Sequence, residues 1–228
     1  MHIGILQAGH WPDALIPSQG NYSGFYIRML SPFGFTFDSY PVVDMVLPGS
    51  IHAADGWLIS GSRHGAYEDH AWIPPLEGFI RDCYGAGVPM VGICFGHQII
   101  AKALGGTVEK FAGGWSVGQQ RYDFGTRGTL ASYAWHQDQV TALPEGAERI
   151  GQSDFCANAA LLYEGRAFTV QPHPEYEPAQ VEGLLEHRAP GVVPPDQIEA
   201  AWGRMDQPVD NAAMAGMIAT FFKERRLE

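Results

Sequence analysis

Short apolar runs alternate with longer amphipathic segments along the first half of the chain. The apolar runs predict strands at residues 2–7, 35–42, 56–60 and 88–93. The segments 20–34 and 74–87 predict helices, because each ends at a glycine and the second begins with two prolines. Strands that alternate with helices are typical of an α/β domain whose central sheet is mainly parallel.

The second half of the chain has a different pattern. From residue 107 to residue 171 the alternation is mostly β-like, which predicts further strands at one edge of the sheet. Residues 209–226 are amphipathic and predict a last helix. The Pro and Gly residues of 187–208 predict a loop with a short helix, whose role stays open. No internal repeat or linker interrupts the pattern, so residues 1–228 are expected to form a single domain.

Composition narrows the class of protein. With 228 residues, of which 46% are hydrophobic and 17% charged, the chain can bury a large core. Its 14 basic and 25 acidic residues give a net charge of −11 without clusters of Lys or Arg, which argues against a nucleic-acid partner. No run approaches the length of a membrane span, and the first residues lack a targeting pattern. Three cysteines without metal-type pairs suit a reducing compartment, so we expect a cytoplasmic protein.

The candidate nucleophile lies in the stretch VGICFGHQ, where the strand 88–93 ends and a helix begins. Gly92, Cys94 and Gly96 form a G-x-C-x-G pattern, the cysteine version of the turn that holds a nucleophile clear of a sheet. Glycines remove the Cβ atoms that would clash in so tight a bend. The free N–H groups and the dipole at the start of the helix favour a thiolate. Cys94 is therefore a candidate nucleophile, and the alternative is a small buried thiol in a glycine-lined turn.

A thiol nucleophile needs a base, and the stretch TVQPHPEYEP contains the best candidate. Its prolines keep the backbone extended, since each restricts itself and the residue before it. Residues two apart in an extended segment face the same way, so His173 and Glu175 should project together. His173 would accept the thiol proton and Glu175 would orient the imidazole, as in a catalytic triad. The alternative is that His-Pro-Glu forms only a polar turn.

VGICFGHQIIAKALGG together with QPHPE resembles the class I (triad) glutamine amidotransferases, and the resemblance extends from the first strand to about Glu177. It implies a flavodoxin-like three-layer α/β fold with extra edge strands, no cofactor, and a triad of Cys94, His173 and Glu175. It also implies that Cys94 attacks a γ-glutamyl amide carbon and releases ammonia or an amine. The thioester that remains would then be hydrolysed by water.

The resemblance extends to the backbone groups that would hold an oxyanion. The stretch ISGSRHGAYED occupies the place of the family's glycine-rich oxyanion strand, so the N–H of Ser62 should pair with that of Phe95. Ser62 and Arg63 replace the family's usual Gly-Pro, which leaves open whether the oxyanion hole is preformed. The alternative is an ordinary Gly/Ser loop.

Three residues are candidates for binding the amino-acid end of the substrate. Gln98, on the first turn of the predicted helix, resembles the family's substrate-contacting glutamine; the alternative is a polar residue that touches nearby backbone. The stretch YAWHQDQV matches the family's segment at a strand end. This match implies that backbone near Trp135 and Gln137 faces the α-amino and carboxylate groups of the substrate.

The other histidines and cysteines have simpler interpretations. His97 lies three residues after Cys94 and is expected to be structural, because a metal site would need more ligands at suitable spacing. No metal site is predicted. His64, His70 and His136 are candidates for the residues at the mouth of a pocket around Cys94. Cys83 and Cys156 lack the G-x-C-x-G pattern and are expected in the core.

The Ser62-Arg63 pair resembles a stand-alone branch of the family that includes γ-glutamyl peptidases, which cleave γ-glutamyl bonds in peptides such as glutathione conjugates. The predicted function is hydrolysis of a γ-glutamyl amide in glutamine or in a γ-glutamyl peptide. One alternative is a glutaminase subunit that gives ammonia to a separate synthetase partner. Two alternatives come from other classes: a PfpI-like peptidase or chaperone, which would lack the His173 and Glu175 pair, and an inactive binding module.

Overall fold

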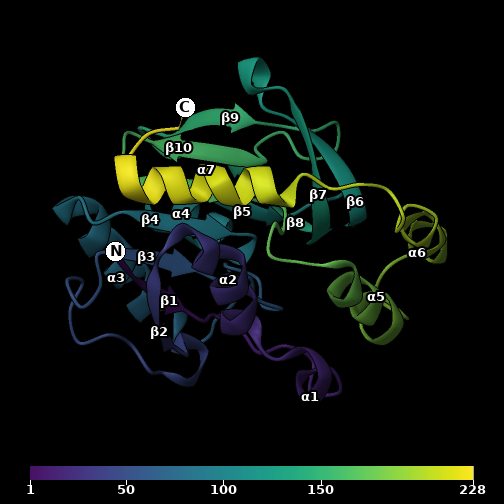
Figure 1. Ribbon diagram of the computed structural model, residues 1–228, viewed down its shortest axis with the longest axis horizontal. Helices are drawn as coiled ribbons and strands as arrows, with labels where there is room; N and C mark the ends of the chain where they lie inside the picture. Colours follow the sequence, from purple (N-terminus) through teal and green to yellow (C-terminus); the bar gives the residue numbers. More distant parts are fainter. Residues whose placement is uncertain (228) are drawn as a thin grey trace.

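The computed structural model describes residues 1–227 and is built around a central sheet of seven strands (Figure 1). In spatial order the strands are β2 (Thr36–Tyr40), β1 (His2–Leu6), β3 (Gly56–Ile59), β4 (Met90–Ile93), β11 (Ala167–Val170), β10 (Ala160–Tyr163) and β9 (Glu148–Gly151). The first five are parallel to one another, and β10 is antiparallel to both of its neighbours. The prediction of an α/β fold with a mainly parallel sheet is confirmed.

A hydrophobic core lies on each face of this sheet. Successive residues of a strand point to opposite faces, and in β1 Ile5 belongs to the first core while Leu6 belongs to the second. All residues of β3, β4 and β11 are buried. This burial is what parallel strands covered on both faces require, and it explains their continuous apolar sequences.

Helices cover both faces. α2 (Tyr22–Leu30) and α7 (Asn211–Glu224) contribute side chains to the first core, and α7 crosses in front of the sheet in Figure 1. α3 (Ile73–Ala86) and α4 (Phe95–Ala103) contribute to the second core. Local signals set the helix ends: the Asn21 side chain accepts the N–H of Tyr22 at 2.9 Å, and α3 ends at Gly87 with a φ of 70°.

The β-rich region from residue 107 to residue 171 corrects part of the prediction. β10 and β9 extend the central sheet as expected. In contrast, β5 (Thr107–Lys110) pairs with β8 (Asp138–Ala142), and β6 (Ser116–Asp123) pairs with β7 (Thr129–His136), in two separate two-stranded sheets. An alternating sequence predicts a strand but does not specify its partner, which depends on contacts distant in sequence.

The segment after the central sheet forms two helices beside β6. α5 (Pro178–His187) starts with a capping box between Glu177 and Gln180. α6 (Pro195–Trp202) approaches β6 at Gly118, where a Cβ atom would lie 2.9 Å from the Cβ of Ala201. The expectation of a loop with a short helix in residues 187–208 is confirmed.

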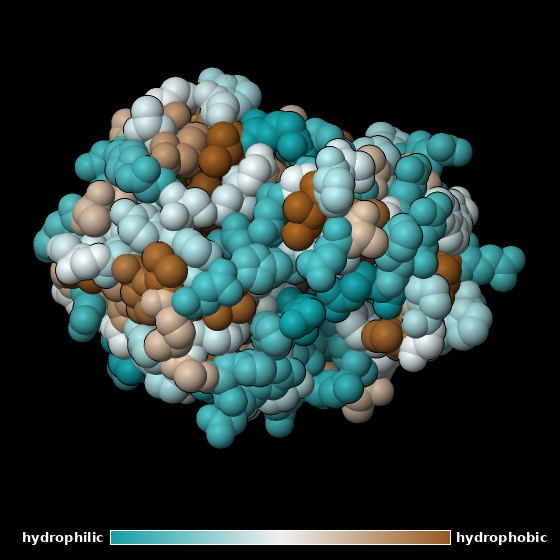
Figure 2. All heavy atoms as spheres, turned by 90° about the horizontal axis from the view of Figure 1, so that it is seen from below, coloured by the Kyte–Doolittle hydropathy of each residue, from teal (hydrophilic) through white to brown (hydrophobic). Residues whose placement is uncertain are grey.

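The remaining helices are short. They are α1 (Ile16–Gln19) and the 3₁₀ helices η1 (Ser31–Phe33), η2 (Val42–Asp44) and η3 (Gly125–Arg127). Within residues 1–227, no helix has both the length and the apolar sequence that crossing a membrane would require. On the face seen in Figure 2, hydrophobic residues form small separate patches among polar ones.

Candidate active site

Cys94 occupies a strained turn between β4 and α4. Its φ of 54° and ψ of −104° lie in a region that non-glycine residues seldom adopt. A Cβ atom at Gly92 would overlap the carbonyl of Gly96, and one at Gly96 would overlap the carbonyl of Ile59. Both glycines are therefore required for the backbone to turn here, and the turn places Cys94 at the N-terminus of α4.

His173 and Glu175 follow β11 and lie side by side. The Nδ1 atom of His173 is 2.7 Å from Oε1 of Glu175, and the two residues are 1% and 3% exposed. The backbone N–H of His173 donates to the carbonyl of Tyr133 at 2.8 Å. Its ring stacks on Tyr176 with 4.1 Å between ring centroids. His173 is thus held at its backbone, at one ring nitrogen and across one face of its ring.

Two effects of opposite sign act on the charge of His173. Burial lowers the pKa of its imidazole, but the negative charges of Glu175 and Cys94 outweigh burial and raise this pKa to about 10. Since Nδ1 faces the Glu175 carboxylate, Nε2 is the nitrogen that can exchange a proton with another group. Nε2 is buried and has no hydrogen-bond partner among residues 1–227. The arrangement suits a general base beside a thiol.

Cys94 lines a pocket of about 180 Å³, and its sulfur lies 3.9 Å from the carbonyl oxygen of Trp135. The pocket brings together four residues that the sequence singled out for binding: Ser62, Gln98, Trp135 and Gln137. Charged residues of both signs also line it: Arg63, Glu68, Lys110 and Asp138. A small pocket with both signs of charge suits a ligand that carries an ammonium and a carboxylate group.

Gln98 has a fixed orientation in this pocket. Its Nε2 donates to the carbonyl of Asp138 at 2.9 Å and to Oε1 of Gln171 at 3.1 Å. These two bonds use both protons of the amide, so the carbonyl oxygen, an acceptor, is the group of this side chain that remains for another partner.

The proposed oxyanion segment contacts the candidate base. Ser62 lines the pocket with Cys94. At the preceding residue, Gly61, a Cβ atom would lie 3.1 Å from Cε1 of His173, so the close approach favours a glycine. The Phe95 side chain packs in the second core, 5.4 Å from the ring of Trp72, and Phe95 is not one of the residues that line the pocket of Cys94.

In the described part of the chain, one group of residues has ligand atoms close enough together to hold a metal ion: His64, Glu68 and His70. Both histidines face one carboxylate oxygen of Glu68, at 3.4 Å from His64 Nδ1 and 2.7 Å from His70 Nε2. The Nε atom of Arg63 is 3.5 Å from His64 Nε2. A guanidinium so close opposes a cation, and hydrogen bonds to Glu68 account for the cluster.

The two other histidines near the pocket are buried. His97 has its Nδ1 atom 2.8 Å from Oγ1 of Thr169, and His136 lines the pocket. Burial lowers the pKa of each to about 3. Both are neutral at physiological pH. Cys83 and Cys156 are buried in the second and the first core.

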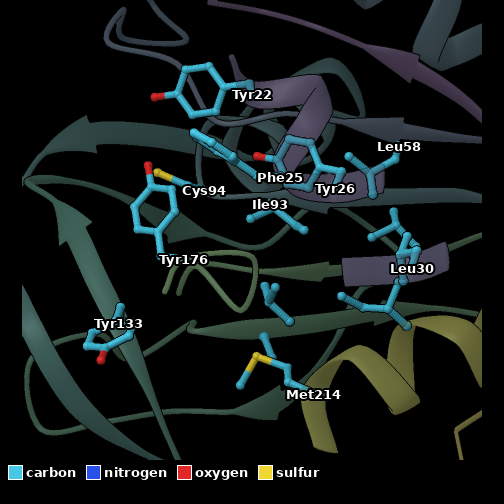
Figure 3. Packing of buried hydrophobic residues seen from close by; sticks show 14 of the residues in the cluster. Tyr22, Phe25, Tyr26, Leu30, Leu58, Ile93, Cys94, Tyr133, Tyr176 and Met214 are labelled. Atoms are coloured by element: carbon cyan, nitrogen blue, oxygen red, sulfur yellow. The ribbon is translucent and has the colours of Figure 1, made fainter. Parts of the chain in front are cut away.

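Sequence motifs did not reveal three tyrosines around Cys94. Figure 3 shows Tyr22 and Tyr26 of α2, and Tyr176, in the same region as Cys94. Tyr26 donates a hydrogen bond to Oε1 of Glu175 at 3.0 Å. The one available signal was that Tyr22 and Tyr26 are one helical turn apart on an apolar face.

The chain belongs to the class I glutamine amidotransferases, because the Glutamine amidotransferase class-I family model matches residues 27–186. Over 177 residues it is 32% identical to a protein of Schizosaccharomyces pombe named as glutamine amidotransferase-like, with 73% of this chain and 71% of that protein covered. It is 32% identical over 173 residues to gamma-glutamyl peptidase 4 of Arabidopsis thaliana, with 69% and 68% covered. It is also 41% identical over 96 residues to a glutamine-hydrolyzing GMP synthase subunit from Archaeoglobus fulgidus, with 39% and 52% covered.

A solved structure shares the fold. The glutamine amidotransferase from Thermotoga maritima matches 99% of this chain and 98% of its own, with a TM-score of 0.75 and 19% identity. The expected family and its flavodoxin-like fold are confirmed. The chain is thus an enzyme of the glutamine amidotransferase class, and its family argues against a PfpI-like protein or an inactive binding module.

Proposed function

We propose that this protein is a γ-glutamyl hydrolase in which Cys94, His173 and Glu175 form a catalytic triad. The observation that carries the proposal is the 2.7 Å contact between His173 and Glu175, buried beside a cysteine in a strained turn. Strained backbone persists where the surrounding structure enforces it, and it is concentrated at functional sites.

In the first half of the proposed reaction, the sulfur of Cys94 attacks the γ-glutamyl amide carbon. The N–H groups of Ser62 and Phe95 stabilise the oxyanion of the tetrahedral intermediate. Nε2 of His173 has taken the thiol proton and gives it to the leaving nitrogen. The carbon–nitrogen bond breaks, ammonia or an amine departs, and a γ-glutamyl thioester remains on Cys94.

In the second half, a water molecule attacks the thioester carbon while His173 accepts one of its protons. The same two N–H groups hold the second oxyanion. The carbon–sulfur bond then breaks, glutamate departs, and the proton returns from His173 to the sulfur. Glu175 stays ionised throughout and keeps Nδ1 of His173 protonated.

The charged residues of the pocket support γ-glutamyl peptides as substrates. The γ-glutamyl group carries an α-ammonium and an α-carboxylate, and the peptide beyond the scissile bond adds another carboxylate. Arg63 and Lys110 line the same pocket as Glu68 and Asp138, so groups of either charge can find a partner. Gamma-glutamyl peptidase 4 is one of the relatives, which agrees with this substrate class.

A second candidate function is that of a glutaminase subunit. The similarity to the GMP synthase subunit of Archaeoglobus fulgidus favours this candidate, since the name of that protein describes one part of a synthase. In this role Cys94 would act on glutamine, and the ammonia would pass to a separate synthetase chain.

We propose a reducing compartment such as the cytoplasm as the place of action. All three cysteines are free thiols and are buried. A thiol nucleophile also needs protection from oxidation to remain active.

The experiment that tests the proposal is a hydrolysis panel on the isolated protein. Glutamine and a series of γ-glutamyl dipeptides are supplied, and release of glutamate, ammonia and amine is measured. Labelling by a glutamine-like electrophile, located by mass spectrometry, identifies the nucleophile. Release of glutamate with labelling at Cys94 is the expected result. Absence of turnover on every substrate, with no labelling of Cys94, would refute the proposal.

A further inference from the structure

Tyr26 bridges two segments that the proposed mechanism uses separately. Its hydroxyl oxygen lies 3.0 Å from Oε1 of Glu175 and 2.9 Å from the backbone nitrogen of Gly61. Glu175 is the carboxylate of the proposed triad, and Gly61 directly precedes Ser62 of the proposed oxyanion hole. Tyr26 itself is fully buried on α2, across from Cys94 in Figure 3.

The direction of both hydrogen bonds follows from their chemistry. A backbone N–H can only donate, so the oxygen of Tyr26 accepts from Gly61. The hydroxyl proton of Tyr26 is then available for the Glu175 carboxylate, which accepts. Oε1 of Glu175 therefore accepts one bond from Tyr26 and one from Nδ1 of His173. A continuous chain of hydrogen bonds runs from the Gly61 amide to the imidazole.

The geometry points to Tyr26 as a positioning residue that fixes the triad carboxylate and the oxyanion segment relative to each other, and this inference rests on the proposed function. Its hydroxyl holds Glu175 in the orientation that His173 needs. The same oxygen accepts the Gly61 N–H and so fixes the peptide between Ser60 and Gly61, one residue before the Ser62 N–H. Tyr26 is not one of the residues that line the pocket of Cys94, and it acts through these two partners.

The surroundings keep this hydroxyl protonated. Burial and the Glu175 charge raise the pKa of Tyr26 well above its usual value, so it remains a donor across the working range of pH. The other titratable groups that interact with Tyr26 or with Glu175 are Tyr22, His173 and Tyr176. A phenylalanine at position 26 would fill the same space and leave two buried polar groups without their partner.

The first test is Tyr26→Phe in the full-length protein, with Tyr163→Phe as the matched control. Tyr163 is also fully buried, but it belongs to the other core. We expect Tyr26→Phe to lower kcat about tenfold or more, with little change in KM, because two buried hydrogen bonds to the machinery are lost. The control should keep both kcat and KM.

A second test needs no substrate. The Nδ1–H proton of His173, bonded to a buried carboxylate, should give a low-field resonance in the NMR spectrum. We expect Tyr26→Phe to shift this resonance, because Glu175 loses its second donor, while Tyr163→Phe leaves it unchanged. If the wild type turned over no γ-glutamyl amide, the proposed function would fail while this resonance still tested the role of Tyr26. An unchanged resonance would overturn the role.

A double-mutant comparison separates positioning from general packing. In a Glu175→Ala background, Tyr26→Phe should cost markedly less than in the wild type, because only its bond to Gly61 remains to be lost. An equal loss in both backgrounds would show that Tyr26 acts independently of Glu175 and would overturn the inference. If Tyr26→Phe fails to fold, 3-fluorotyrosine at position 26 replaces it. This residue keeps the hydroxyl and donates more strongly, so it should shift the Nδ1–H resonance, and an unchanged resonance would overturn the role.

Discussion

The two sides of the pocket differ in burial and in what holds them. The catalytic side, which we define as Cys94, His173 and Glu175, is 6%, 1% and 3% exposed. Hydrogen bonds, a stacked ring and a strained turn fix it. The rim, which we define as residues 62–68, is a loop in which Tyr67 is 44% exposed.

This difference separates the residues proposed to perform the reaction from those proposed to select the substrate. Catalytic groups must be held in a narrow range of geometry, which buried neighbours can enforce. An exposed loop tolerates substitutions at lower cost, so it is where members of one family can differ in substrate. Ser62 and Arg63, which replace the usual Gly-Pro, belong to the rim. Substitutions on the catalytic side should therefore affect turnover of every substrate, and those on the rim should affect the choice of substrate.

The largest effect is expected at Cys94. Cys94→Ala should lower turnover by about 10⁴-fold or more on every substrate, because it removes the atom that forms the thioester in the proposed mechanism. Cys94→Ser should be similarly inactive. Both side chains are small enough for the turn, so the circular dichroism spectrum should match the wild type. Substantial turnover by a correctly folded variant would assign the chemistry to another group.

The second prediction ranks the losses of turnover expected at His173 and at Glu175. His173→Ala should cost nearly as much as loss of Cys94, and Glu175→Gln should cost roughly a hundredfold less, because the orienting carboxylate contributes least alone. Steady-state kcat/KM on one γ-glutamyl dipeptide measures both. Equal losses, or the reverse order, would show that the roles of base and orienting group are assigned wrongly.

Much of the catalytic side could be predicted from sequence because its signals are local. Gly92, Cys94 and Gly96 lie within one turn, and the prolines around His173 restrict their own neighbours. Tyr26 could not be predicted as a partner of Glu175, because the two residues are 149 positions apart in the sequence. The same limit applied to β5 and β8, whose pairing joins distant segments. Local sequence specifies conformation, whereas tertiary contacts specify which conformations meet.

The third effect concerns the oxyanion segment at the start of the rim. If the N–H groups of Ser62 and Phe95 already face the pocket, the isolated protein should turn over its substrate without a partner. We expect this result, with γ-glutamyl peptides preferred over free glutamine. A missing oxyanion donor would cost on the order of 10²–10³ in rate. Glutamine turnover that rises by about a hundredfold on addition of a synthetase would instead identify an ammonia-donating subunit.

A smaller effect is expected at Arg63, on the exposed part of the rim. Arg63→Ala should raise KM for γ-glutamyl dipeptides by about tenfold, because a charge-assisted hydrogen bond to the peptide carboxylate is lost. Turnover of free glutamine, which lacks that carboxylate, should change little. Arg81→Ala, on α3 and away from the pocket, is the matched control. Equal changes for dipeptides and glutamine would show that Arg63 contributes to the γ-glutamyl site itself.

The smallest effect on turnover is expected at His97, which belongs to the buried support of the site. Its pKa is about 3 in the folded protein against an ordinary value of 6.5, because burial disfavours the imidazolium and a protonated His136 would disfavour it further. Between these pH values the unfolded chain binds a proton that the folded one does not, so the free energy of unfolding falls as the pH drops below 6.5. One such proton is worth about 1.4 kcal/mol per pH unit.

His97→Asn should therefore be less sensitive to acid than the wild type in urea unfolding at pH 7 and pH 5, while its kcat stays near the wild-type value. His52→Asn, at an exposed position, should keep the wild-type dependence. The same acid sensitivity in all three proteins would mean that His97 is already protonated at pH 5 in the folded protein, contrary to its burial.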